Sequence, residues 1–105
     1  MQLNGKSVKV LLSYDPLPEQ REEYFRYVLG EFIPAMENLG LPMCEAWHTA
    51  YGPYPLRLIG FMANTPEALE KGLSSEEFQE LEGRLQEFVA NYHRKIVRQL
   101  PRFQF

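Results

Sequence analysis

The sequence predicts one α+β domain in which four strands form an antiparallel sheet and two helices cover one face. Three observations lead to this prediction. Strand-like alternation of apolar and polar residues occurs near the start, in the middle and near the end of the 105 residues. Two stretches with helical spacing separate these regions, which gives the order strand, helix, strand, strand, helix, strand. That order is the split βαβ arrangement, and the length favours a single domain over residues 1–105.

The first strand is expected at residues 8–14, where apolar residues alternate with more polar ones. The first helix is expected at residues 19–39, because its apolar residues recur three and four apart and form one stripe. Pro34 lies inside this helix and should kink it near Gly30, since the proline ring clashes with the carbonyl four residues earlier. Gly40 marks the end of the helix.

A central hairpin is expected from strands at Met43–Tyr51 and Leu56–Ala63, joined by a four-residue turn. In the second of these strands both alternating sets are apolar, so both of its faces need cover. The turn length sets which residues lie opposite each other, because it fixes the register of the hairpin. A four-residue turn would place His48 opposite Ile59 and beside Arg57.

The second half is expected to be mainly helical before it returns to the sheet. A short helix should follow Thr65, and a longer one should start at Ser74 or Ser75 and continue to Tyr92. The fourth strand is expected at residues 95–100. The apolar tail after this strand needs either a partner surface or a place on its own domain.

Composition excludes several classes of function. The net charge is −3 and the 11 Lys and Arg residues are interleaved with acids, so nucleic-acid binding is disfavoured. No apolar run approaches the roughly 20 residues of a membrane span, and the first residues lack the apolar region of a signal peptide. The single cysteine, Cys44, suits a cytoplasmic protein without internal disulfides, and we expect it to be buried and inert. Only His48 and His93 could supply imidazole ligands, and their spacing predicts no metal site.

The face of the sheet without helices is the reason to expect a homodimer. It should carry Leu11 and either the Trp47 set or the Ile59 set of the hairpin. If about eight apolar side chains lie there, each contributes roughly 1.5–3 kcal/mol on burial, which together exceeds the usual stability of a small domain. A second copy packed sheet against sheet would cover them.

In its order of elements, its length and its kinked first helix, the chain resembles the dimeric α+β barrel superfamily, which has a ferredoxin-like fold. That group includes the antibiotic-biosynthesis monooxygenases, the stress-responsive barrel proteins and the NIPSNAP-type proteins. The resemblance implies a dimer that encloses a cavity for a small organic molecule. For the monooxygenase branch it implies oxidation of aromatic compounds without a metal or a flavin, and hence no cofactor. It does not assign catalytic residues.

His48 is the candidate catalytic residue, because an imidazole can accept or donate a proton near neutral pH. The alternative is a hydrogen-bonded structural histidine in the core or at the sheet edge. Candidate ligand-binding residues are the cationic and aromatic side chains that could line a cavity or its mouth. These are Arg57, Trp47, Tyr14, Tyr51 and Phe61.

Two functions from different classes fit these features. The first is a small cytoplasmic homodimer that acts on a small apolar or aromatic molecule as a cofactor-free monooxygenase or an isomerase-like enzyme. The second is a non-catalytic, ligand-binding or stress-associated dimer whose interior is filled by its own side chains. A pocket lined by His48, Arg57 or Trp47 would favour the first.

Overall fold

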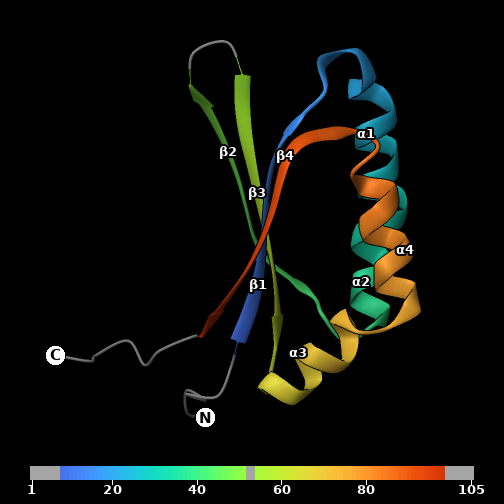
Figure 1. Ribbon diagram of the computed structural model, residues 1–105, viewed down its shortest axis with the longest axis vertical. Coiled ribbons are helices and arrows are strands. Elements are labelled where there is room, and N and C mark those ends of the chain that lie inside the picture. The colour runs from blue at the N-terminus through green and yellow to red at the C-terminus, as the bar shows by residue number, and fades with distance from the viewer. Residues whose placement is uncertain (1–7, 52–53, 99–105) are drawn as a thin grey trace, which may run out of the picture.

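The computed structural model describes residues 8–51 and 54–98 and has the predicted α+β architecture, with one layer of helices against one sheet (Figure 1). The sheet is antiparallel and its strands lie in the order β2-β3-β1-β4, as in a ferredoxin-like fold. The strands are β1 (Val8–Pro16), β2 (Met43–Tyr51), β3 (Tyr54–Ala63) and β4 (Val89–Arg98).

Burial in β1 alternates as predicted. Val8, Val10, Leu12 and Tyr14 face the helices and are buried, whereas the residues between them are half-buried on the opposite face. The helices add a large apolar set to the same core and cover the middle of this face, whereas Ile96 of β4, on the same face, is 59% exposed. The largest fully buried members of the core from outside β1 are Tyr24, Phe32, Phe61 and Phe78.

The first helical segment is interrupted in the region where the kink was predicted. It starts as a 3-10 turn, η1 (Pro18–Gln20), followed by α1 (Arg21–Tyr27), a π-helical turn, η2 (Val28–Phe32), and α2 (Ile33–Asn38). Pro34 has no N–H to donate to the preceding turn, and a π-helical turn is one way to accommodate such a break. The segment ends at Gly40, whose φ of +85° is the left-handed conformation that glycine favours there.

The hairpin register differs from the prediction by two residues. Tyr51 pairs with Tyr54, so the strands are joined by residues 52–53 rather than by four residues. His48 therefore lies opposite Arg57, not Ile59, and Trp47 lies opposite Leu58. A shift of two residues leaves every side chain on its expected face, because the faces alternate with a period of two.

Both helix starts in the second half are capped as predicted. Oγ1 of Thr65 accepts the N–H of Ala68 at the start of α3 (Pro66–Leu73). Oγ of Ser75 accepts the N–H of Phe78 at the start of α4 (Glu76–Leu85). Each such cap stabilises its helix by about 1 kcal/mol.

The predicted end of the second long helix is wrong. We expected it to reach Tyr92, but α4 ends at Leu85 and β4 begins at Val89, six residues before the predicted start of the fourth strand. The N–H of Phe88 bonds to the carbonyl of Leu85, which closes the helix, and the carbonyl of Phe88 accepts the N–H of Leu17. Apolar residues 88, 89 and 92 fit a helical stripe as well as a strand, which explains the error.

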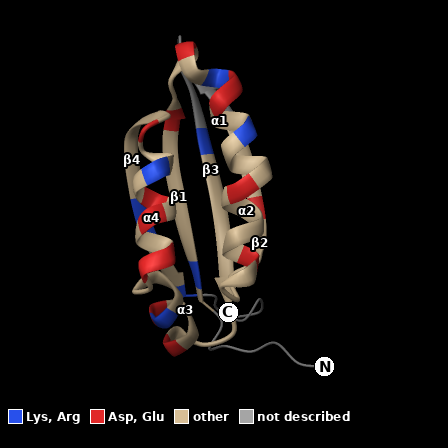
Figure 2. Cartoon of the chain, turned by 90° about the vertical axis from the view of Figure 1, so that its right-hand side faces the viewer, with Lys and Arg blue, Asp and Glu red and all other residues tan. Residues whose placement is uncertain are grey.

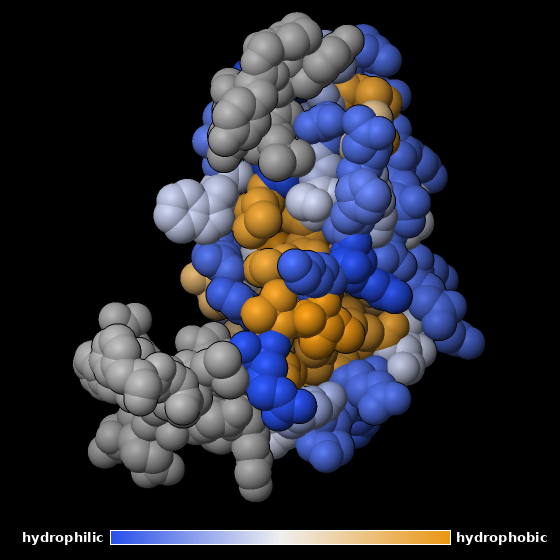
Figure 3. All heavy atoms as spheres, turned by 60° about the vertical axis from the view of Figure 1, so that its left-hand side comes forward, coloured by the Kyte–Doolittle hydropathy of each residue, from blue (hydrophilic) through white to orange (hydrophobic). Residues whose placement is uncertain are grey.

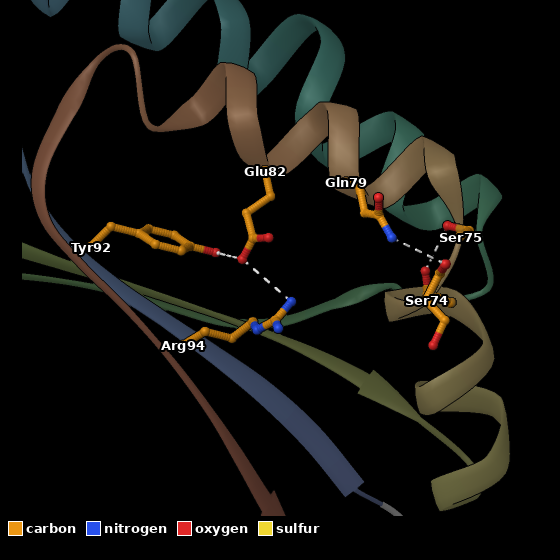
Figure 4. A network of polar contacts seen from close by, with 7 residues as sticks. Ser74, Ser75, Gln79, Glu82, Tyr92 and Arg94 are labelled. Atoms are coloured by element: carbon orange, nitrogen blue, oxygen red, sulfur yellow. Dashed lines mark hydrogen bonds and ion pairs between the residues drawn. The ribbon is translucent and has the colours of Figure 1, made fainter.

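The carboxylate of Glu82 connects α4 to β4 (Figure 4). Glu82 accepts a hydrogen bond from the hydroxyl of Tyr92 at 2.8 Å and forms an ion pair with Arg94 at 3.3 Å. The side chain of Glu82 is half-buried, with 19% of its surface exposed. Figure 2 shows further acidic residues, in red, along the helices that lie in front of the sheet. The contacts of Glu82 therefore tie the early part of β4 to α4.

The uncovered sheet face has an apolar patch interrupted by polar groups (Figure 3). Its described apolar side chains are Leu11, Trp47, Leu58, Met62 and Val97. Among them, Nζ of Lys9 contacts Oε2 of Glu45 at 2.8 Å, so these two residues form a half-buried ion pair. Glu45 reaches Lys9 across Gly60, which has no side chain to block it.

Cys44 is exposed rather than buried, which contradicts the sequence-based expectation. It lies where the β2–β3 register shifts between Met43 and Glu45, so the regular alternation that would have buried it is interrupted there. Partial desolvation and the charge of Glu45 raise the pKa of its thiol, which disfavours the reactive thiolate. None of the helices within the described ranges is long and apolar enough to cross a membrane.

Candidate functional site

A pocket of about 170 Å³ lies between the first helical segment and the hairpin end of the sheet. Its walls come from the loop after β1, from α1 and from strands β2 and β3. The lining residues are Pro16, Leu17, Pro18, Arg21, Phe25, His48 and Arg57. A cavity of about 150 Å³ can hold benzene, so this pocket suits a molecule with one ring.

His48 and Arg57 are brought together by the antiparallel pairing of β2 and β3. They lie directly opposite each other on the face that carries the helices, and both line the pocket. The sequence-based prediction that these two residues neighbour each other is confirmed, although the detailed register was wrong. An imidazole and a guanidinium at one pocket wall can move a proton and stabilise the resulting negative charge.

Arg57 is held between the sheet and the aromatic side chains of α1. Its guanidinium carbon lies 5.1 Å from the ring centroid of Phe25 and 5.8 Å from that of Tyr24. Each distance is within the range of a cation–π contact. Nε of Arg57 is buried and has no hydrogen-bond partner in the described part of the chain. The side chain is therefore oriented by ring faces, and these contacts give its buried Nε no hydrogen-bond acceptor.

Tyr14 lies behind Arg57 rather than in the pocket lining. It pairs with Arg57 across β1 and β3, is fully buried, and its hydroxyl lies 2.8 Å from that of Tyr24. Burial raises the pKa of both hydroxyls, so both remain protonated at neutral pH. Tyr14 also stacks on Tyr92, with ring centroids 6.3 Å apart. Tyr14, Tyr24 and Tyr92 thus form a cluster of aromatic rings beside Arg57.

The other predicted ligand-binding residues lie elsewhere. Trp47 is on the opposite, uncovered sheet face, is 62% exposed, and donates a hydrogen bond from Nε1 to Glu45. Phe61 is fully buried in the core, where it packs edge-on against Phe32. The side chain of Tyr51 lies outside the described residues. The predicted set therefore combined residues from both faces of the sheet, and the structure separates them.

Five lining residues were not predicted from the sequence: Pro16, Leu17, Pro18, Arg21 and Phe25. Leu17 and Arg21 flank the 3-10 turn that leads from β1 into α1. Phe25 was assigned only to the apolar stripe of the helix. The one signal in the sequence was the proline-rich break before the helix, which places the start of α1 beside the end of β1.

The described side chains offer no metal centre, since no three His, Cys, Asp or Glu residues among them could hold an ion. Two wider grooves also occur. One, of about 450 Å³, separates the first helical segment from α4, and the other, of about 570 Å³, lies between α3 and β4. In the first, Glu31, Glu77 and Glu80 line the walls, and Arg84 stacks over Tyr27. Neither groove contains a predicted site residue.

No family model matches the chain, and no curated protein matches its sequence. Solved structures do match its fold. A NIPSNAP-like domain protein from Burkholderia xenovorans has a TM-score of 0.68 at 17% identity, with 96% of this chain and 90% of that chain covered. An antibiotic biosynthesis monooxygenase-like protein from Caulobacter crescentus has a TM-score of 0.69 at 9% identity, with 93% of each chain covered.

A further monooxygenase-like protein, from Nitrosomonas europaea, has a TM-score of 0.65 at 8% identity and covers 98% of this chain and 97% of its own. These matches span nearly the whole chain, so they concern the entire domain and not one motif. They confirm the resemblance predicted from the order of elements. At these identities the similarity shows the fold alone: the chain has the ferredoxin-like α+β fold that NIPSNAP and monooxygenase-like proteins share.

Proposed function

We propose that this protein is a cytoplasmic, cofactor-free enzyme that transfers a proton on a small, mainly apolar molecule held in the His48–Arg57 pocket. The observation that carries the proposal is the position of the two residues opposite each other in one pocket wall. His48 would remove the proton from a phenol or an enolisable carbon. Arg57 would stabilise the anion that forms, since a charge in a partly desolvated pocket is stabilised more strongly than in water.

The anion can then react in two ways. In an isomerase-like reaction the proton returns to a different atom of the same conjugated system. In a monooxygenase reaction a CH₂ group becomes a carbonyl: one atom of O₂ is retained, the other leaves as water, and the substrate supplies the electrons. The names of the monooxygenase-like structural neighbours support the second route, and the pocket volume favours single-ring substrates over larger ones.

Proton transfer is common to both routes, so it provides the first test. Exchange of carbon-bound substrate hydrogen for deuterium in D₂O, followed by NMR over a panel of single-ring phenols and enolisable ketones, should reveal turnover. Oxygen uptake on the same panel distinguishes the oxygenase from the isomerase. We expect His48→Ala to lower the exchange rate about 10²- to 10⁴-fold, the usual contribution of a general base.

The matched control is His93→Ala. His93 is exposed on the uncovered face of the sheet, and the sequence contains no histidine besides these two. This control variant should exchange as fast as the wild type. If His48→Ala turned over at the wild-type rate, His48 would have no role in the reaction. Saturable binding without exchange or oxygen uptake would instead support the alternative of a non-catalytic binding protein.

We further propose that the protein is a homodimer paired through its uncovered sheet faces. The apolar patch around Leu11 and Leu58 supports this, as does Trp47, which is 62% exposed there. A Trp side chain buries roughly 150–250 Å², so covering the exposed part of Trp47 would contribute about 3 kcal/mol per protomer at about 25 cal/mol per Å².

Sedimentation equilibrium at micromolar concentration should give twice the chain mass for the wild type. Trp47→Ser should dissociate more readily, whereas Leu29→Ser should not, because Leu29 is equally exposed but lies on the helical side. A compact wild-type monomer would refute the dimer.

A further inference from the structure

The His48–Arg57 pocket has an unbalanced charge. Arg21 and Arg57 line it together with the imidazole of His48, and its lining includes no acid. The acids adjacent in sequence to lining residues are Asp15, Glu19 and Glu22, and none of them is among the lining residues. Asp15 accepts a hydrogen bond from Asn91, and Glu19 and Glu22 are exposed. No ion pair between described residues involves either arginine. The pocket therefore presents positive charge that has no ion-pair partner among the described residues, although the whole chain is acidic.

Arg57 has hydrogen-bonding capacity that a ligand could use. Its guanidinium packs against Phe25 and Tyr24, and its buried Nε has no acceptor within the described residues. A buried charged donor without an acceptor is unfavourable. A carboxylate offers two oxygens in the planar arrangement that matches a guanidinium. Aromatic contacts on its face leave the edge of the guanidinium available for such a pair.

The rest of the pocket is apolar. Leu17, Phe25 and two prolines form walls without charge, within a volume of about 170 Å³. A bare inorganic anion would leave these walls without contact, and a neutral ring would leave Arg57 unpaired. A molecule with one ring and one carboxylate satisfies both parts of the pocket.

We infer that the ligand of this pocket is a single-ring carboxylate, whose carboxylate pairs with Arg57 and whose ring packs against Phe25. This inference rests on the proposed function only in that both use the same pocket. Arg21 is exposed on α1 and adds a second positive charge at the pocket. It therefore contributes less than Arg57, since an exposed charge is screened by solvent and salt.

Titration calorimetry with benzoate, benzyl alcohol and inorganic phosphate tests this. Benzoate and benzyl alcohol have the same ring, and only benzoate is charged. We expect benzoate to bind about ten- to a hundredfold more tightly than benzyl alcohol, the range of a charge-assisted hydrogen bond. Phosphate should bind more weakly than benzoate. Arg57→Gln should lose about ten- to a hundredfold in benzoate affinity, while its affinity for benzyl alcohol stays within about threefold of the wild type.

Two further variants keep the test decisive. Arg26→Gln removes an exposed arginine from the same helix, outside the pocket, and should bind benzoate like the wild type. Arg57→Lys retains the charge but not the planar fork, so its affinity should fall between those of the wild type and Arg57→Gln. If circular dichroism shows that Arg57→Gln does not fold, the test becomes the comparison of benzoate affinity between Arg57→Lys and Arg26→Gln. Arg57→Lys should then bind benzoate more weakly than Arg26→Gln.

The outcomes separate this inference from the proposed function. If benzoate and benzyl alcohol bind equally tightly, or if the Arg57 variants bind benzoate as tightly as the wild type, the inference that the ligand carries a carboxylate is wrong. The pocket would still bind a ligand. If phosphate binds as tightly as benzoate, the inference that the ligand contains a ring is wrong. If none of the three probes binds, the carboxylate inference fails. The proposed function then depends on the deuterium-exchange panel, which includes uncharged phenols and ketones.

Discussion

Gly60→Ala tests how closely the uncovered sheet face is packed. A Cβ at Gly60 would lie 2.8 Å from Cγ of Glu45 and 3.0 Å from Cδ2 of Leu11, closer than the 3.4–4 Å of ordinary contacts. Glu45 would have to move, which would break its 2.8 Å contact with Lys9. Overpacking of this kind costs roughly 1–3 kcal/mol, and the lower entropy of the unfolded chain offsets about 0.4–1 kcal/mol. We expect a net loss of roughly 1–2 kcal/mol in the free energy of unfolding.

Urea denaturation followed by circular dichroism, at one fixed protein concentration, measures this loss. Gly83→Ala is the matched control. An added Cβ there meets no atom within 4 Å, and the position is exposed in α4. Alanine should therefore stabilise that variant by about 1 kcal/mol. The two glycine substitutions should thus shift stability in opposite directions.

The effects of substitutions at Gly60 and Glu45 on the free energy of unfolding should also be coupled. In a Glu45→Ala background the side chain that obstructs the new methyl group is shorter, so Gly60→Ala should cost less than in the wild type. Wild-type stability in Gly60→Ala, or an equal cost in both backgrounds, would refute the argument that Glu45 requires a glycine beneath it.

Three other predictions concern single side chains. Tyr14→Phe leaves the buried hydroxyl of Tyr24 without its partner, so urea titration should show a loss of roughly 1–2 kcal/mol; a neutral effect would mean that this hydrogen bond adds no stability. Cys44, although exposed, has a thiol pKa raised by partial desolvation and by Glu45, so iodoacetamide should alkylate it more slowly than glutathione at pH 8, and a faster reaction would contradict this. The hydrogen bond from Lys9 lowers the pKa of Glu45, so this carboxylate stabilises the fold above the unfolded pKa and loses that contribution as pH falls through the folded one. The stability difference between wild type and Glu45→Gln should therefore shrink from pH 7 to pH 3, and a constant difference would contradict the linkage.

Much of the fold could be predicted because local signals agree with the tertiary structure. The alternation of β1, the caps at Thr65 and Ser75, and the glycine at position 40 act within a few residues, and each has the predicted role. The wrong end of the second long helix came from a sequence pattern that fits two kinds of secondary structure. The apolar residues after Leu85 suit a helix or a strand, and pairing with β1 selects the strand.

Two of the seven lining residues, His48 and Arg57, could be predicted from the sequence. The predicted and observed hairpin registers differ by two residues, which preserves the faces, and His48 and Arg57 are neighbours in both. Trp47 was grouped with them, although adjacent strand residues point to opposite faces. Arg21 and Phe25 could not be assigned to the pocket, since their positions depend on how the first helix crosses the sheet, which no local pattern specifies.

The most direct test of the ligand pocket follows the two histidines by NMR. The sequence contains only His48 and His93, so the imidazole region of a ¹H–¹³C spectrum contains two residues that a His93→Ala variant would assign. During titration with benzoate, the His48 signals should move and saturate while the His93 signals, on the opposite sheet face, stay fixed. If the His48 signals stay fixed with benzoate and with benzyl alcohol, or the His93 signals move in their place, the pocket beside Arg57 is not where such molecules bind.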